Sequence, residues 1–196
     1  MTTEANVTEA VDPLVHCRLT PGQSRFRVQA FAEGLLSAFG HDPILEAGEF
    51  SGDVEFIPET FSDATVKLSV DASSLRVTNI AKEKDRDEIE RTMRDSVLET
   101  AKFKNITFRS TRVTVARLAD KRYRATIVGD MSLHGIVQNN LWISAEVTVN
   151  ENTLQARGEF PLKQKDFGIK PVSVAGGTLK VKNEVKCSFD VTATLE

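Results

Sequence analysis

Residues 181–195 read VKNEVKCSFDVTATL, a run in which apolar and polar side chains alternate almost without a break. The apolar positions of one parity are Val181, Val185, Cys187, Phe189, Val191, Ala193 and Leu195. Successive side chains of a β-strand point to opposite faces of the sheet. The alternation therefore predicts a long strand with one face toward a core and the other toward water.

The same period of two recurs along nearly the whole chain. It covers residues 26–30, 50–56, 66–70, 106–108, 123–133, 141–149 and 154–162. Turn-forming residues stand between strand patterns, at Pro21-Gly22, His134-Gly135, Asn139-Asn140 and Asn150–Asn152. These short turns predict that neighbouring strands are mostly antiparallel.

The number and spacing of these strands indicate an all-β fold. A switch of apolar parity between Ser110 and Val113 predicts a β-bulge, which bends a strand and suits a closed sheet. About eight or nine strands, with no sequence repeat longer than a hairpin, favour a single antiparallel β-barrel. A two-sheet sandwich is the alternative, because alternation does not show whether a sheet closes.

One charge-rich stretch interrupts the strand pattern. Residues 83–100, EKDRDEIERTMRDSVLET, predict a helix because apolar residues recur on one helical stripe, at Ile89, Met93, Val97 and Leu98. The charges of this stretch suit a solvated helix face. A shorter helical turn is expected near residues 32–39, with Gly40 at its end.

The composition fits one folded domain over residues 14–196, preceded by a flexible segment, residues 1–13. The chain has 196 residues, 40% of them apolar, and a formal net charge of −3. We expect no nucleic-acid partner, because no basic stripe is present. We also expect no transmembrane segment, since the longest charge-free stretch, residues 131–145, has only 15 residues and contains polar side chains. The N-terminus lacks a secretory pattern, which favours the cytoplasm, or the periplasm if a leader has been removed.

Residues suited to catalysis or metal binding are scarce. The sequence contains none of the common nucleophile, zinc or phosphate-loop motifs, and its histidines, His16, His41 and His134, are scattered. We therefore predict no enzyme activity, no metal site and no cofactor. An enzyme would need His41, His134 and Asp166 to gather at one opening within hydrogen-bond reach of a substrate.

The two cysteines share the inward parity of the first and the last strand. Cys17 lies between the apolar residues Val15 and Leu19, and Cys187 belongs to the alternating run that ends the chain. In a closed meander these two strands pair, which makes the sulfurs candidates for cross-strand neighbours. We expect two buried free thiols, with a disulfide as the alternative.

Three segments carry a family signal. They are residues 93–110, where MRDSVLET runs toward FKNITFRS, residues 129–136, GDMSLHGI, and residues 165–169, KDFGI. In this order they resemble the helix-to-strand signature, the G-D-L-T-hydrophobic-H-G turn and the late D-F-G-I motif of the YceI-like family of polyisoprenoid-binding, lipocalin-like proteins. Gln23 departs from the family pattern, which tends to have histidine there. The resemblance implies an eight-stranded, lipocalin-like barrel whose interior holds a long isoprenoid-type lipid without turning it over.

The candidate ligand contacts are the bulkiest inward positions of the strands. They are Phe26, Val28, Phe50, Val54, Phe56, Phe108, Ile127, Met131, Ile143 and Phe189. A polar head group is expected at the barrel mouth, near His41 or Asp166. A barrel of this strand number is wide enough either to be packed solid or to hold one slim ligand.

The expected function is non-enzymatic binding, transport or storage of a polyisoprenoid, an isoprenoid quinone or a similar lipid. Two alternatives stay open. One is a solid barrel that serves as a stress or interaction module without a ligand. The other, less favoured, is an enzyme that acts on a small amphiphile. A homodimer is compatible with the sequence, although no surface stripe identifies its interface.

Overall fold

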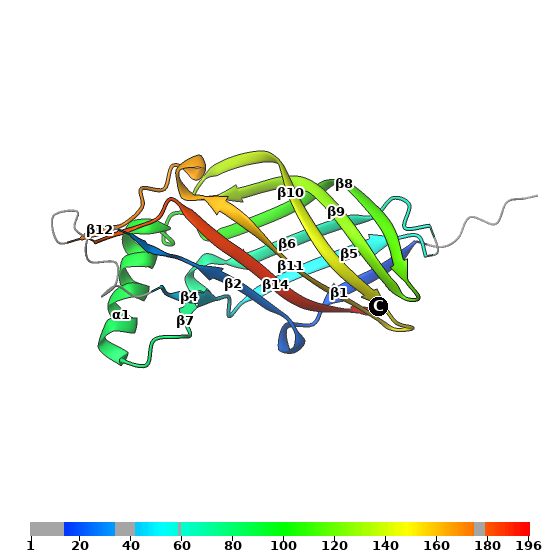
Figure 1. The fold of residues 1–196 in the computed structure, drawn as a ribbon, viewed down its shortest axis with the longest axis horizontal. Helices are drawn as coiled ribbons and strands as arrows, with labels where there is room; N and C mark the ends of the chain where they lie inside the picture. Colours follow the sequence, from blue (N-terminus) through cyan, green and yellow to red (C-terminus); the bar gives the residue numbers. More distant parts are fainter. Residues whose placement is uncertain (1–13, 34–41, 59, 175–178) are drawn as a thin grey trace, which may run out of the picture.

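Long antiparallel strands dominate the computed structural model, which describes residues 14–33, 42–58, 60–174 and 179–196 (Figure 1). The strands are β1 (Val15–Leu19), β2 (Arg25–Gln29), β3 (Ala32–Glu33), β4 (Ile44–Glu46), β5 (Phe50–Phe56), β6 (Thr65–Asp71), β7 (Arg76–Val77), β8 (Asn105–Ala119), β9 (Arg122–Leu133), β10 (Ile136–Val149), β11 (Thr153–Lys163), β12 (Ser173–Val174), β13 (Leu179–Val181) and β14 (Glu184–Leu195). The helical segments are α1 (Glu83–Thr92), the π-helix η4 (Met93–Val97), and the 3₁₀ turns η1 (Pro21–Gln23), η3 (Ala72–Ser74) and η5 (Gln164–Phe167).

Eight antiparallel strands close into a barrel. In the order β1-β5-β6-β8-β9-β10-β11-β14 each strand pairs with the next, and β14 returns to β1. The closing register places Cys17 opposite Leu195 and Leu19 opposite Ala193. The predicted antiparallel barrel is thus confirmed. The sandwich alternative is wrong, because β1 and β14 pair with each other and close the sheet.

Short strands lengthen the barrel wall at the end that carries α1. β2 continues the path of β1 along β14, β4 pairs with β2, and β7 pairs with β4. Pro21-Gly22 therefore does not reverse the chain, contrary to our expectation of a tight turn. The η1 turn is an insertion between two strands that both run antiparallel to β14. Proline lacks a backbone N–H, so it suits such a break in a ladder of hydrogen bonds.

The other predicted irregularities divide into confirmed and corrected cases. A register shift between Ser110 and Arg112 confirms the bulge in β8. His134-Gly135 forms the turn between β9 and β10, with positive φ at both residues. Asn139-Asn140 was expected to be a turn but lies inside β10, where it forms a bulge against β9. Asn140 has φ +59°, a conformation that asparagine tolerates in bulges as well as in turns.

The predicted helix is confirmed over residues 83–97, where the π-helix η4 directly continues α1. One residue of the expected solvated face is buried. The Glu90 carboxylate accepts the backbone N–H of Val77 at 2.8 Å and a guanidinium N–H of Arg94 at 3.3 Å. Glu90 therefore ties α1 to β7 and holds the helix against the extended wall of the barrel.

The helical turn expected near residues 32–39 is wrong where it can be checked. Ala32–Glu33 form β3, which pairs with β13 in a small sheet that also contains β12. Residues 34–39, Gly40 and the N-terminal residues 1–13 lie outside the described residues. The partner of β3 is distant in sequence, so local spacing could not reveal it.

Candidate functional site

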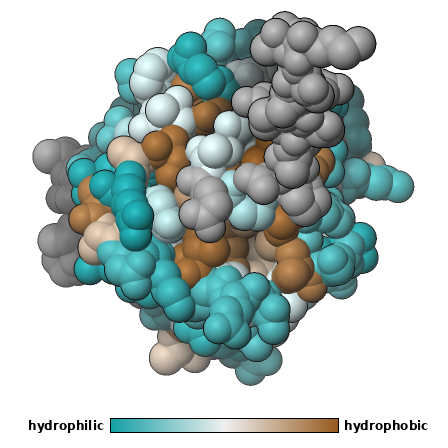
Figure 2. Space-filling view, turned by 90° about the vertical axis from the view of Figure 1, so that its right-hand side faces the viewer, coloured by the Kyte–Doolittle hydropathy of each residue, from teal (hydrophilic) through white to brown (hydrophobic). Residues whose placement is uncertain are grey.

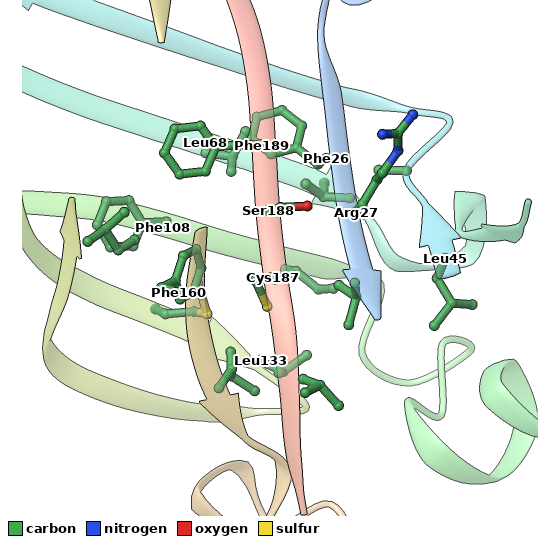
Figure 3. Close-up of a pocket in the computed structure, with 18 of the residues that line it drawn as sticks. Phe26, Arg27, Leu45, Leu68, Phe108, Leu133, Phe160, Cys187, Ser188 and Phe189 are labelled. Carbon is green, nitrogen blue, oxygen red and sulfur yellow. The ribbon is translucent and has the colours of Figure 1, made fainter. Parts of the chain in front are cut away.

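A cavity of about 670 Å³ lies inside the barrel. Its wall is built from inward side chains of all eight barrel strands, and residues of α1 and η4 line one of its ends. Figure 3 shows part of this wall, where Phe108, Phe160 and Leu133 surround the same space as the Cys187 sulfur. We call this cavity the lumen. Its size falls in the range usual for small-molecule pockets.

The structure places all but one of the expected contact residues along the lumen. The lining includes Phe26, Val28, Val54, Phe56, Phe108, Ile127, Met131, Ile143 and Phe189. Phe50 is the exception, because its ring packs edge-on against Phe26 with the ring centroids 4.9 Å apart. It also packs against the buried cluster that contains Val70 and Met93. Whether the lining residues contact a ligand stays a prediction.

The burial of these side chains shows that the barrel is hollow. Phe26, Val28, Val54 and Phe189 point inward, yet each is only partly buried because it faces the lumen. In a solid core at ordinary packing density, such positions would be closed off by neighbours. The alternative of a solid-core barrel without a ligand does not agree with this arrangement.

The polar part of the lumen lies beneath α1. Asp85, Glu88 and Thr92 line it together with Ile89, at the three- and four-residue spacing that puts side chains on one face of a helix. Lys180 of β13 lines the same cavity. These residues were not predicted as lumen contacts, because only the apolar stripe of the helix pointed to a buried face. The charged residues that share the face of this stripe could have indicated a polar contact with the lumen.

Gln164 adds a buried amide to the lumen. Its side chain lines the cavity, and the residue is only 8% exposed. Its Nε2 donates to the backbone carbonyl of Lys182 at 2.9 Å, which fixes the orientation of the amide because a carbonyl can only accept. Among the described residues, no donor meets its Oε1. The oxygen is therefore a hydrogen-bond acceptor available to a ligand.

The opposite end of the lumen is apolar and aromatic. Phe56 and Ala64 line it, and Phe61 joins them from the segment that links β5 to β6. Figure 2 faces this end of the molecule, where apolar side chains gather toward the middle within a polar rim. The two ends of the lumen thus differ in chemistry.

The three motif segments meet at one structural corner. His134 Nε2 lies 2.6 Å from the Glu99 carboxylate, and His134 Nδ1 lies 3.3 Å from the carbonyl oxygen of Phe167. The imidazole also packs on Phe103, with the centroids 4.5 Å apart. Gly168 ends η5 in the left-handed conformation, φ +68°. The motifs therefore join the helix-to-strand loop, the β9–β10 turn and η5.

The expected polar mouth residues do not gather at the lumen. Asp166 is exposed on η5 and is not part of the cavity wall, while His41 lies outside the described residues. His134 has both ring nitrogens engaged at the corner and does not line the lumen. The grouping that an enzyme would need is thus not found among the described residues.

The two cysteines are free. Cys17 lies opposite Leu195, and Cys187 lies opposite Val28. The two thiols are therefore not cross-strand neighbours, although their strands pair. Burial raises the pKa of both thiols, that of Cys187 to about 12. Cys187 faces the lumen, enclosed by protein but next to empty space. The expectation of two free thiols is confirmed, and Cys17 is buried as expected, whereas Cys187 is only partly buried.

The described part of the chain contains neither a candidate metal site nor a membrane-spanning helix. No group of three or more His, Cys, Asp or Glu side chains there is placed to hold a metal ion. No helix described here combines the length and the apolar character needed to cross a bilayer.

A closed antiparallel barrel around an apolar cavity is the architecture in which β-barrel proteins enclose ligand cavities. A sequence profile of the YceI-like domain matches residues 23–193, and the chain belongs to that family. The family assignment agrees with the resemblance in the three motif segments.

Solved structures share the fold at low sequence identity. A polyisoprenoid binding domain from Saccharophagus degradans superposes with a TM-score of 0.66 at 16% identity, over 94% of this chain and 100% of that one. BcnA from Burkholderia cenocepacia gives 0.64 at 15% identity, over 89% and 98%. A YceI protein from Campylobacter jejuni gives 0.58 at 11% identity, over 78% and 84%. No protein with curated function matches the sequence significantly.

Proposed function

We propose that this protein binds one long apolar chain of polyisoprenoid type in its lumen, and that it carries or stores the lipid without altering it chemically. The observation that supports this most strongly is the continuous apolar cavity of about 670 Å³, which extends from α1 to Phe61. A similar fold in a protein described as a polyisoprenoid binding domain adds support.

The energetics favour a chain over a compact polar ligand. Each buried CH₂ group contributes about 0.8 kcal/mol, and an apolar chain demands no matched hydrogen bonds. The ligand's polar end belongs beneath α1, where Gln164 offers an acceptor and Asp85, Glu88 and Lys180 provide charge. The tail then extends toward the aromatic end of the lumen.

Extraction and titration test this function together. Organic extracts of the purified protein are analysed by mass spectrometry, and the emptied protein is titrated with geranylgeraniol by calorimetry at several temperatures. We expect a prenyl-type lipid in the extract or one-to-one binding of the added alcohol, with a negative heat-capacity change that reports burial of apolar surface. A clean extract together with no binding would refute the proposal.

A further inference from the structure

Two aromatic rings, those of Phe56 and Phe61, line the end of the lumen opposite α1, and a third, Tyr123, packs against Phe61. The ring of Phe61 stacks on Phe56, with the centroids 5.4 Å apart and the planes 17° apart. On its other side it meets Tyr123 at 4.6 Å. Phe56 is the last residue of β5, and Tyr123 lies near the start of β9. Phe61 thus bridges two strands that are not neighbours in the barrel, across its end.

The backbone of Phe61 is held in an uncommon conformation. Its φ is +54°, in the left-handed region that residues with a side chain rarely adopt. Two hydrogen bonds fix it there: the Phe61 N–H donates to the Ile57 carbonyl at 2.8 Å, and the Ile57 N–H donates to the Ser62 carbonyl at 3.1 Å. Strained conformations of this kind persist where the surroundings over-determine them and cluster at binding sites.

From these observations we infer that Phe61 is a stopper that sets the length of chain the lumen accepts. This inference rests on the proposed function and deepens it by naming a specificity-determining residue. The ring lines the lumen on one side, and Tyr123 packs against it without lining the lumen. A chain that enters beneath α1 gains contacts with each added isoprene unit until its tip reaches Phe61. Longer chains gain nothing further.

The test is a series of linear prenols of increasing length, from geraniol through farnesol and geranylgeraniol to longer members. For the unaltered protein, affinity rises by about tenfold or more with each added isoprene unit and then reaches a plateau. Phe61→Ala opens the end of the lumen and moves the plateau to longer prenols by at least one unit. Phe61→Trp keeps the stopper and leaves the plateau where it is or shifts it to shorter chains.

Phe103→Ala is the matched control, because it removes a ring of the same kind that packs on His134 outside the lumen. It leaves the plateau unchanged. Phe61→Leu, a milder change, shifts the plateau in the same direction as alanine and serves if Phe61→Ala does not fold. If the unaltered protein binds prenols and every Phe61 variant reaches its plateau at the same chain length, the stopper is overturned while the proposed function stands. Unaltered protein that binds no prenol overturns the proposed function and the stopper with it.

Discussion

Cys187 shows how a single side chain reports on the lumen. Its neighbours enclose it, so the charged thiolate is poorly solvated, and burial raises the pKa to about 12 from an ordinary value of 9.0. The sequence predicted its inward direction from parity alone. Parity could not show that the thiol faces a cavity, because an inward position looks the same in a solid core and in a hollow one.

The raised pKa of Cys187 predicts a loss of stability at alkaline pH. Below about pH 9 both the folded and the unfolded state keep the proton, so this thiol makes no pH-dependent contribution. Between about pH 9 and about pH 12 only the unfolded chain releases it, and the free energy of unfolding falls by up to about 1.4 kcal/mol per pH unit. Urea unfolding of the protein and of Cys187→Ala at about pH 8 and about pH 10.5 measures this. Equal losses in both proteins would contradict it.

His134 is the residue through which the three motif segments contact one another. Replacing it with alanine removes the hydrogen bonds to Glu99 and Phe167 and the packing on Phe103. We expect a loss of about 2–3 kcal/mol in the free energy of unfolding, because hydrogen bonds to charged groups are worth about 1.5–3 kcal/mol. The control is His16→Ala, whose side chain is more exposed. We expect that change to cost under about 1 kcal/mol. Similar losses of stability in the two variants would contradict the structural role of His134 at this corner.

At the scale of the element, α1 covers the polar end of the lumen and Glu90 anchors it. The carboxylate accepts from the Val77 N–H of β7 and from Arg94, and it lies 3.9 Å from Arg76. One buried acidic side chain therefore connects the helix to the barrel wall. Met93, the first residue of η4 directly after α1, adds an apolar contact by packing in a buried cluster with Ala47, Val70 and Leu75.

Loss of this anchor should loosen the helix. Glu90→Ala leaves the Val77 N–H without its partner, and we expect a cost of about 1–3 kcal/mol in stability. Hydrogen exchange in α1 should become faster than in the unaltered protein. Glu90→Gln keeps an acceptor for Val77 and should show a smaller effect, and the exposed Asp87→Asn should show none. An exchange rate in α1 that is the same in all four proteins would speak against the anchor.

The elements that alternation governs could be predicted from the sequence, and those that depend on distant partners could not. The long strands from β8 to β14, the helix after Lys82 and the bulge after Ser110 follow from local pattern. Whether Pro21 and Asn140 make turns or bulges depends on which strand lies alongside, which spacing does not report. Phe61 and Gln164 were missed because they lie in connections, outside any periodic run.

At the scale of the whole molecule, our proposal places the ligand in the lumen. A bulky side chain introduced into the lumen should therefore abolish binding. Ala156 lines the lumen from β11, and its neighbour Gln155 points outward and is exposed. Ala156→Phe places a ring in the cavity, and we expect at least a tenfold loss of affinity for geranylgeraniol. Gln155→Phe adds the same ring to the outer surface and should bind as the unaltered protein does.

Both variants are compared by calorimetric titration after their folding has been checked by thermal unfolding. Over-packing costs about 1–3 kcal/mol in a solid core, and a cavity should accept the ring at less cost. Undiminished binding by a folded Ala156→Phe variant would place the ligand outside the lumen.

A crystal structure of the protein grown with geranylgeraniol tests the central claim most directly. We expect continuous electron density for one chain along the barrel axis, with its hydroxyl near Gln164 and its tail directed at Phe61. A lumen filled by collapsed side chains, or a chain lying on the outer face of the barrel, would contradict it.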